Sequence, residues 1–154
     1  TMTQPRRRAW RSPLAAVGAG AAVAAAVLVL AVRAGSPAGE LELQAVLAAP
    51  IGPARAAVDV RETGIGRVIT FRSDSLPILP KGAYYELWFV GPGDRAGRRN
   101  RISAGTFHPD QQGRSDARFT AAVDPARFPV LSVTAEPGDG DPRPTGPEVL
   151  RSRT

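Results

Sequence analysis

The feature of this sequence that most constrains its fold is an uncharged apolar run near the N-terminus. Residues 12–32, SPLAAVGAGAAVAAAVLVLAV, lie between Arg11 and Arg33 and contain no charged side chain. As an α-helix, a run of 21 residues would be about 30 Å long, which matches the hydrocarbon thickness of a bilayer. Neither face of such a helix carries a polar stripe, so packing on a water-soluble core is disfavoured. The run therefore predicts a single transmembrane helix.

A cleaved secretory signal is the alternative interpretation of the same run. Basic residues precede it, and small residues before Gly35 would suit a signal peptidase. The run is, however, longer than the apolar core of about 7–15 residues that signal peptides use. A retained anchor is therefore the preferred prediction. Recovery of a mature chain that begins near Gly35 would support the cleaved signal instead.

The flanking charges predict the orientation of this helix. Arg6, Arg7, Arg8 and Arg11 precede the apolar run, and only Arg33 follows it closely. The positive-inside rule then places the N-terminus in the cytoplasm and the rest of the chain outside, as in a single-pass protein of the cell membrane. The predicted parts are a cytoplasmic basic segment at 1–11, the helix at 12–32, a Gly/Pro/Ser-rich tether at 33–40 and an extracytoplasmic domain at 41–154.

Charge and cysteine content exclude several classes of function for the outer domain. The formal net charge of +6 is misleading, because four of the 20 basic residues form the N-terminal cluster and all 14 acidic residues follow it. The remaining charges are mixed along the chain, without the concentrated basic face that nucleic-acid binding needs. The chain has no cysteine, which excludes disulfides, thiol catalysis and zinc-thiolate sites.

Beyond the tether, the hydrophobic period changes to two, as expected for strands. Leu41, Leu43, Ala45 and Leu47 share one face of the first segment. Turn-forming Gly, Pro, Asp and Asn clusters separate the segments. The predicted strands are ELELQAVLA, ARAAVDVRE, GRVITFR, YYELWFV, RISAGTF, DARFTAAV, VLSVTAE and PEVL. With no amphipathic helix between them, they predict an all-β domain, an antiparallel β-sandwich of immunoglobulin-like type.

The segment GAYYELWFV holds four of the nine aromatic residues of the chain. In a strand, Tyr85, Leu87 and Phe89 would point to one side, and Glu86 and Trp88 to the other. Both faces are largely apolar, which predicts a central strand that is covered on both sides. A buried Glu86 carboxylate would need a partner, and an arginine or a backbone donor is expected. A ligand-binding role for Glu86 is the alternative.

Four motifs, YYELWFV, ISAGTF, VLSVTAEP and PTGPEVL, occur in this order. Together with the preceding apolar run, they resemble the extracytoplasmic domain of the anti-sigma-K factor family of bacterial anti-sigma factors. The resemblance covers roughly residues 41–150. It implies a β-sandwich and a membrane-anchored negative regulator of sigma-factor-dependent transcription. Its implied partners are the lipid bilayer, a sigma factor and regulatory proteases, which release the sigma factor by cutting outside and within the membrane.

One feature departs from this family pattern. The family's sigma-binding unit is a small helical domain before the membrane helix, often with a zinc motif of one His and two Cys. Here only 11 residues precede the apolar run, and the single histidine, His108, follows it. Thr1 ahead of Met2 indicates an excerpt of a longer protein or a gene model that begins late, so the sigma-binding domain is expected to be absent from this chain. The alternative is a stand-alone, membrane-anchored binding or structural module.

Enzymatic and metal-binding hypotheses have weaker support. His108 is the only candidate base for a Ser-His-Asp hydrolase, and it precedes Pro109 at an expected strand-to-turn junction. No Gly-x-Ser-x-Gly nucleophile motif occurs. Glu136, Asp139 and Asp141 could line a calcium loop but lack EF-hand spacing. The prediction is a non-enzymatic protein with no catalytic, cofactor or metal residues, and its partner-binding residues are not assigned.

Overall fold

The described part of the chain forms short strands because apolar and polar residues alternate along it, and Gly or Pro separates one alternating segment from the next. The structure is a computed structural model that describes residues 39–153. The predicted basic segment, the predicted membrane helix and the first six residues of the predicted tether lie outside this part. Within residues 39–153, no helix is long and apolar enough to cross a bilayer.

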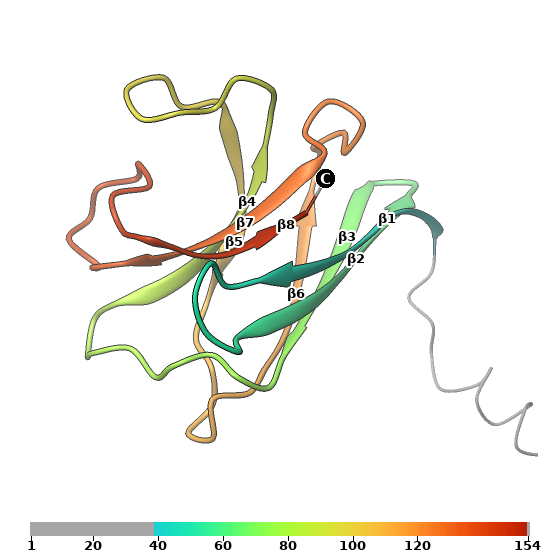
Figure 1. Ribbon diagram of the computed structural model, residues 1–154. Coiled ribbons are helices and arrows are strands. Elements are labelled where there is room, and N and C mark those ends of the chain that lie inside the picture. The colour runs from blue at the N-terminus through green and yellow to red at the C-terminus, as the bar shows by residue number, and fades with distance from the viewer. Residues whose placement is uncertain (1–38, 154) are drawn as a thin grey trace, which may run out of the picture. The chain divides into compact units, whose positions relative to one another are not determined.

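Eight strands make up the described part of the chain. Their bounds are β1 (Glu40–Ala48), β2 (Arg55–Thr63), β3 (Gly66–Ser73), β4 (Tyr84–Val90), β5 (Arg101–Phe107), β6 (Ser115–Ala121), β7 (Val130–Glu136) and β8 (Glu148–Ser152). All neighbouring pairs are antiparallel, and the order across the sheet is β5-β4-β7-β8-β1-β2-β3-β6 (Figure 1). The all-β, antiparallel prediction is therefore confirmed.

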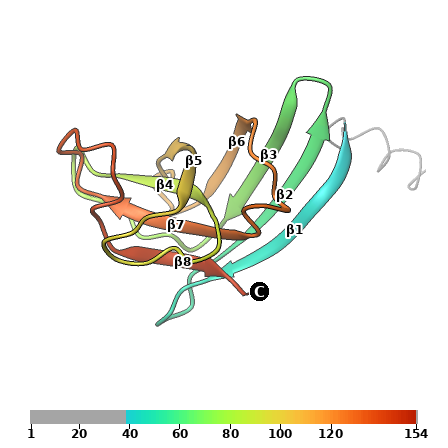
Figure 2. The ribbon, with the colours of Figure 1, turned by 90° about the horizontal axis from the view of Figure 1, so that it is seen from above.

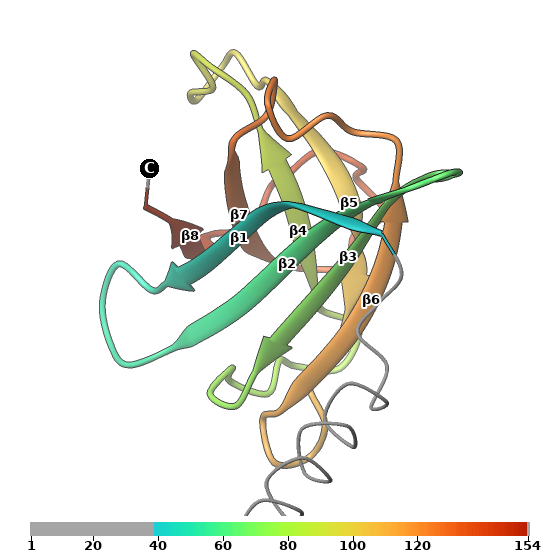
Figure 3. The ribbon, with the colours of Figure 1, turned by 90° about the vertical axis from the view of Figure 1, so that its right-hand side faces the viewer.

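The predicted β-sandwich is confirmed in its coarse form, as two facing halves of antiparallel strands, and its immunoglobulin-like type stays a prediction. The strands form one continuous sheet whose two halves, β5-β4-β7-β8 and β1-β2-β3-β6, are joined where Leu47 pairs with Ser152 and Ala48 with Arg151. The sheet curls so that its two arms enclose a common interior (Figures 2 and 3). The result is a nearly closed barrel. Periodicity predicted the strands and their faces, but it contains no information on which edges pair.

The core lies between the two halves of the sheet, and β4 is its most deeply buried strand. β4 lies between β5 and β7, and Tyr85, Leu87 and Phe89 are buried in the core cluster. The hydroxyl of Tyr85 donates to the carbonyl of Pro77 at 2.8 Å. Trp88 points to the other side of the strand and is also buried. The prediction of a covered central strand is confirmed.

The first strand is buried unevenly along its length. Leu47, at the joint with β8, is fully buried, whereas the side chain of Leu41 is 42% exposed. The predicted shared face holds for Leu43 and Leu47, which pair with Val60 and Ala56, but not for Leu41. A bulge between Leu41 and Leu43 shifts the register, so Leu41 pairs with Arg61 and leaves the core face. The beginning of β1 therefore lies at the open border of the core.

Candidate functional site

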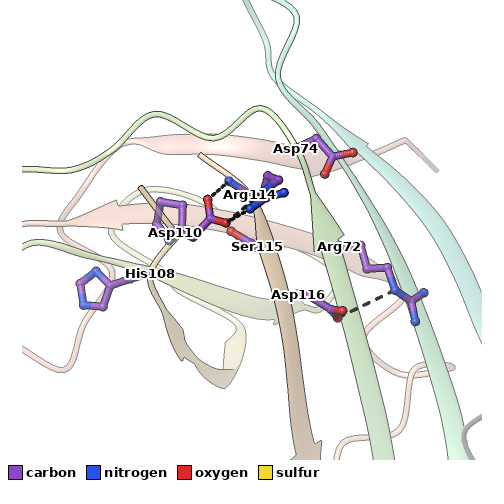
Figure 4. A pocket seen from close by; sticks show the side chains of 8 residues that line it. Arg72, Asp74, His108, Asp110, Arg114, Ser115 and Asp116 are labelled. Carbon is purple, nitrogen blue, oxygen red and sulfur yellow. Dashed lines mark hydrogen bonds and ion pairs between the residues drawn. The ribbon is translucent and has the colours of Figure 1, made fainter. Parts of the chain in front are cut away.

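A charged hollow of about 600 Å³ lies at one end of the barrel, where β3 ends and β6 begins (Figure 4). It combines carboxylates, guanidinium groups and the single histidine of the chain, so it is the natural place to look for catalysis or ligand binding. It is lined by Arg72, Asp74, His108, Pro109, Asp110, Arg114, Ser115 and Asp116.

The charges of this hollow are largely engaged with one another. Asp110 accepts hydrogen bonds from the backbone amides of Gln112 and Arg114, both at 2.9 Å, and from Nε of Arg114 at 2.9 Å. The hydrogen bond from the backbone amide of Arg114 is the main cause that lowers the pKa of Asp110. Arg72 Nε lies 3.8 Å from Asp116 Oδ1 across the β3–β6 ladder. These contacts stabilise a tight turn, and they are sufficient to explain the clustering.

The histidine of this hollow lies as the sequence predicts, at a strand-to-turn junction. His108 follows directly after β5, is exposed, and turns its ring away from Asp110 and Ser115 (Figure 4). The Ser115 hydroxyl is buried, and no hydrogen-bond partner for it lies within residues 39–153. Nucleophilic catalysis requires the nucleophile and the base to be within hydrogen-bond reach. This geometry gives no support to a hydrolase.

The three acids that were candidates for a calcium loop are each bound separately. Asp141 pairs with Arg143, whose side-chain and backbone hydrogen bonds lower the pKa of Asp141 to about 2. Asp139 accepts a hydrogen bond from the backbone amide of Asp141 at 2.9 Å. Within residues 39–153, no three His, Cys, Asp or Glu side chains are grouped closely enough to hold a metal ion.

Glu136, the third of these acids, joins two of the sequence motifs. It is buried at the end of β7, and its Oε2 accepts hydrogen bonds from the amides of Thr145 and Gly146, at 3.0 and 2.8 Å, and from the Thr145 hydroxyl. The VLSVTAEP motif therefore supplies the carboxylate, and the PTGPEVL motif supplies its donors. A Cβ at Gly146 would lie 1.8 Å from the carbonyl oxygen of Ala135, so glycine is required there. We call this contact the Glu136 clamp.

The other two motifs meet in the same way on β4 and β5. Glu86, from YYELWFV, accepts a hydrogen bond from the Ser103 hydroxyl of ISAGTF. The expectation of an arginine or a backbone donor for Glu86 was therefore wrong. Burial raises the pKa of the Glu86 carboxyl, which fits a partner that carries no charge. Gly105 of the same motif has a φ of 143°, and a Cβ there would lie 2.5 Å from the ring of Phe119.

A buried ion pair in the β4–β5 connection was not predicted from the sequence. Asp94 and Arg101 have almost no exposed side-chain surface, and Arg101 Nε donates to Asp94 Oδ1 at 3.2 Å. Asp94 also accepts a hydrogen bond from the amide of Asn100 at 2.8 Å, so it organises the loop between them. The segment GPGDRAGRRN is typical of a solvated turn because Gly and Arg dominate its composition. An acid at the fourth position of the segment and a base directly after its last residue are the sequence signal of the pair.

The residues of the four motifs therefore contribute to the packing of the sheet, through Glu86 with Ser103 and Glu136 with Thr145 and Gly146. The family model described as "Anti-sigma-K factor rskA, C-terminal" matches residues 16–148, which is most of the chain. Comparison with curated proteins and with solved structures gives no match. The family match begins within the apolar run and ends at the first residue of β8. The chain belongs to the anti-sigma-K factor family and contains its C-terminal domain.

Proposed function

We propose that this chain is the regulatory, extracytoplasmic part of a membrane-anchored anti-sigma factor that negatively regulates sigma-factor-dependent transcription. The observation that carries the proposal is the extent of the family match, which includes most of the apolar run together with the folded domain. The match therefore covers residues 16–32 of the proposed anchor together with the domain. The sigma factor is the partner that membership of the family implies.

The proposed topology places residues 1–11 in the cytoplasm and the barrel outside. It is supported by the four arginines before the apolar run and by the absence of charge within it. A reporter that is active only outside the cytoplasm, fused after Thr154, should give signal in cells. A fusion that is stably produced but inactive would contradict this orientation.

In the proposed mechanism, the barrel acts by steric control of proteolysis. The tether at 33–40 is rich in Gly, Pro and Ser, a composition typical of protease-accessible segments. Its last two residues are already held by the fold, because Arg61 donates to the carbonyl of Gly39 and Glu40 pairs with Glu62 in the sheet. The folded state of the barrel would therefore determine how much of the tether a protease can reach.

The test uses the full-length gene in its native host. Deletion of the gene should raise transcription from one set of sigma-dependent promoters, and deletion of residues 40–154 should change their repression. Glu136→Ala, which releases the β7–β8 loop, should shift repression in the same direction as the domain deletion. Asp139→Asn is the matched control, because it alters an exposed carboxylate of the same loop.

The result that overturns the proposal is equally direct. If neither deletion of the gene nor deletion of the domain alters transcription from any sigma-dependent promoter, the anti-sigma function is wrong. A membrane-anchored binding or structural module without a sigma-factor partner then replaces it.

A further inference from the structure

The first strand has a hydrogen-bonding edge that the barrel leaves open. β1 pairs with β2 along its whole length, but it pairs with β8 only at Leu47 and Ala48. From Glu40 to Val46, the β8 side of the strand has no partner strand within residues 39–153. The other backbone hydrogen bonds of this part of the chain do not involve these residues. Unpaired amides and carbonyls of this kind are a template for an added strand.

A groove of about 310 Å³ runs along this edge. One wall is formed by four consecutive residues, Glu40 to Leu43, and the other by Asp124 to Ala126 in the β6–β7 loop. The four residues lie on both sides of the bulge between Leu41 and Leu43, so the groove follows the bulged beginning of the strand. Figure 3 shows the β6–β7 loop passing alongside this half of β1. The groove lies where a longer β8 would pair.

The chemistry of the groove selects its occupant. Its charged lining residues are all carboxylates, Glu40, Glu42 and Asp124, and no basic side chain lines it. Glu42 is neutralised by Arg67, which contacts its two oxygens at 2.8 and 3.0 Å. Glu40 and Asp124 form no ion pair within residues 39–153. The partly exposed side chain of Leu41 adds an apolar contact.

We propose that this groove, the β1 edge groove, binds an extended, basic peptide segment of a partner protein, which adds as a strand beside Glu40–Val46. Backbone hydrogen bonds to β1 would provide affinity, as in other cases of strand addition. Glu40 and Asp124 would favour Lys or Arg in the segment, and Leu41 would contact an apolar side chain. A second copy of this chain fits less well, because it would bring its own carboxylates into the groove.

The regulatory consequence rests on the proposed function. The groove begins at Glu40, the last residue of the proposed tether. A partner strand seated there would lie beside the cleavage segment and would hold β1 on both of its edges. Binding is therefore expected to slow cutting of the tether, and loss of the partner would restore it.

The binding test uses the domain at residues 39–154, whose core is formed by side chains of its own strands and loops. The probe is the peptide acetyl-Thr-Val-Arg-Val-Arg-Val-amide, followed by amide chemical shifts in NMR. Shifts are expected for the amides of residues 40–46, Asp124 and Ala126. A peptide with Glu in place of both Arg should bind about three- to tenfold more weakly at low salt, because two exposed ion pairs are lost. N-methylation of alternate residues should abolish binding.

Matched variants separate the groove from general charge effects. Glu40→Gln with Asp124→Asn keeps an acceptor for the hydrogen bond that the amide of Ala126 donates to the side chain of residue 124, and should remove the preference for the Arg peptide. Asp74→Asn with Asp139→Asn removes the same charge from exposed positions elsewhere and should leave the preference intact. If the Arg peptide shifts no amide of β1 at millimolar concentration, or if both double variants behave alike, the proposal is wrong.

The two proposals can fail independently. Peptide binding in vitro with no effect of the domain on transcription would leave the groove standing and reject the anti-sigma function. If the domain affects transcription but does not bind the peptide, the groove proposal is rejected and the anti-sigma function is retained. In cells, the Glu40→Gln and Asp124→Asn double variant should change the rate of tether cleavage, measured by immunoblot of the full-length protein. An unchanged rate would reject the regulatory role of the groove.

Discussion

Removal of the Glu136 clamp should destabilise the barrel measurably. In Glu136→Ala, the amides of Thr145 and Gly146 lose their acceptor. Because both residues are partly accessible, water can replace part of the loss, so about 1 kcal/mol for each amide is expected. One buried methylene group, Cγ, adds about 0.8 kcal/mol. The substitution also removes the buried Oε1 of Glu136, which has no hydrogen-bond partner within residues 39–153. This removal offsets about 1 kcal/mol of the loss. The expected loss of unfolding free energy is therefore about 2 kcal/mol.

Glu136→Gln discriminates between the carboxylate charge and its shape. The amide oxygen can occupy the position of Oε2, but the hydrogen bonds lose their charge assistance. The amide nitrogen then takes the position of Oε1, for which no partner lies within residues 39–153. We expect a loss of about 1–2 kcal/mol, smaller than that of Glu136→Ala, whereas Asp139→Asn should stay within about 0.5 kcal/mol of the wild type.

The assay is urea unfolding of the domain at residues 39–154 with linear extrapolation, together with amide hydrogen exchange. Exchange at Thr145 and Gly146 should become faster in Glu136→Ala and should not change in the Asp139→Asn control. A loss below about 0.5 kcal/mol, or unchanged exchange at the two amides, would refute the assignment of the clamp.

Two further predictions concern buried polar contacts. Trp88→Ala should cost about 3–5 kcal/mol, because Trp88 is buried and its Nε1 donates to the Thr134 hydroxyl at 2.8 Å; a loss below about 1 kcal/mol in urea unfolding would show that this side of β4 is loosely covered. Asp94→Asn should cost about 2–3 kcal/mol at pH 7, since it leaves the buried Arg101 guanidinium without its counter-charge. The hydrogen bond from Arg101 lowers the pKa of Asp94, so this stabilisation is present above the unfolded pKa of about 3.9 and is lost as the pH falls through the folded pKa. The stability difference between wild type and variant should accordingly shrink from pH 5 to pH 2, and a difference independent of pH would contradict the ion pair.

The strands could be predicted from the sequence because alternation and turn residues are local signals. The bounds of β1, β4, β5 and β7 coincide with ELELQAVLA, YYELWFV, RISAGTF and VLSVTAE, and the others differ by one or two residues. The deep burial of Tyr85, Leu87 and Phe89 also followed from the pattern. Each of these features depends on residues within a few positions of one another.

The pairing of edges could not be predicted in this way. Whether β6 adds to β3, and whether β1 meets β8, depends on contacts between distant segments that periodicity does not encode. The partners of Glu86 and Glu136 were missed for the same reason. Their donors, Ser103 and the Thr145–Gly146 amides, are brought near by strand register and loop geometry. For Glu86, burial alone had suggested an arginine or a backbone donor, and for Glu136 the calcium loop was only a weakly supported alternative.

The joint between β1 and β8 has a consequence for the order in which the domain can form. The β1-β2-β3 meander consists of neighbouring segments and can assemble as soon as its residues are available. The joint, in contrast, needs Leu47 and Ser152, which lie near opposite ends of the domain, so its loop-closure entropy is high and its formation must await the last strand. A chain that emerges N-terminus first would therefore expose half of its sheet until β8 arrives. Refolding is expected to be slow for a domain of this size, with closure of the joint as a late step.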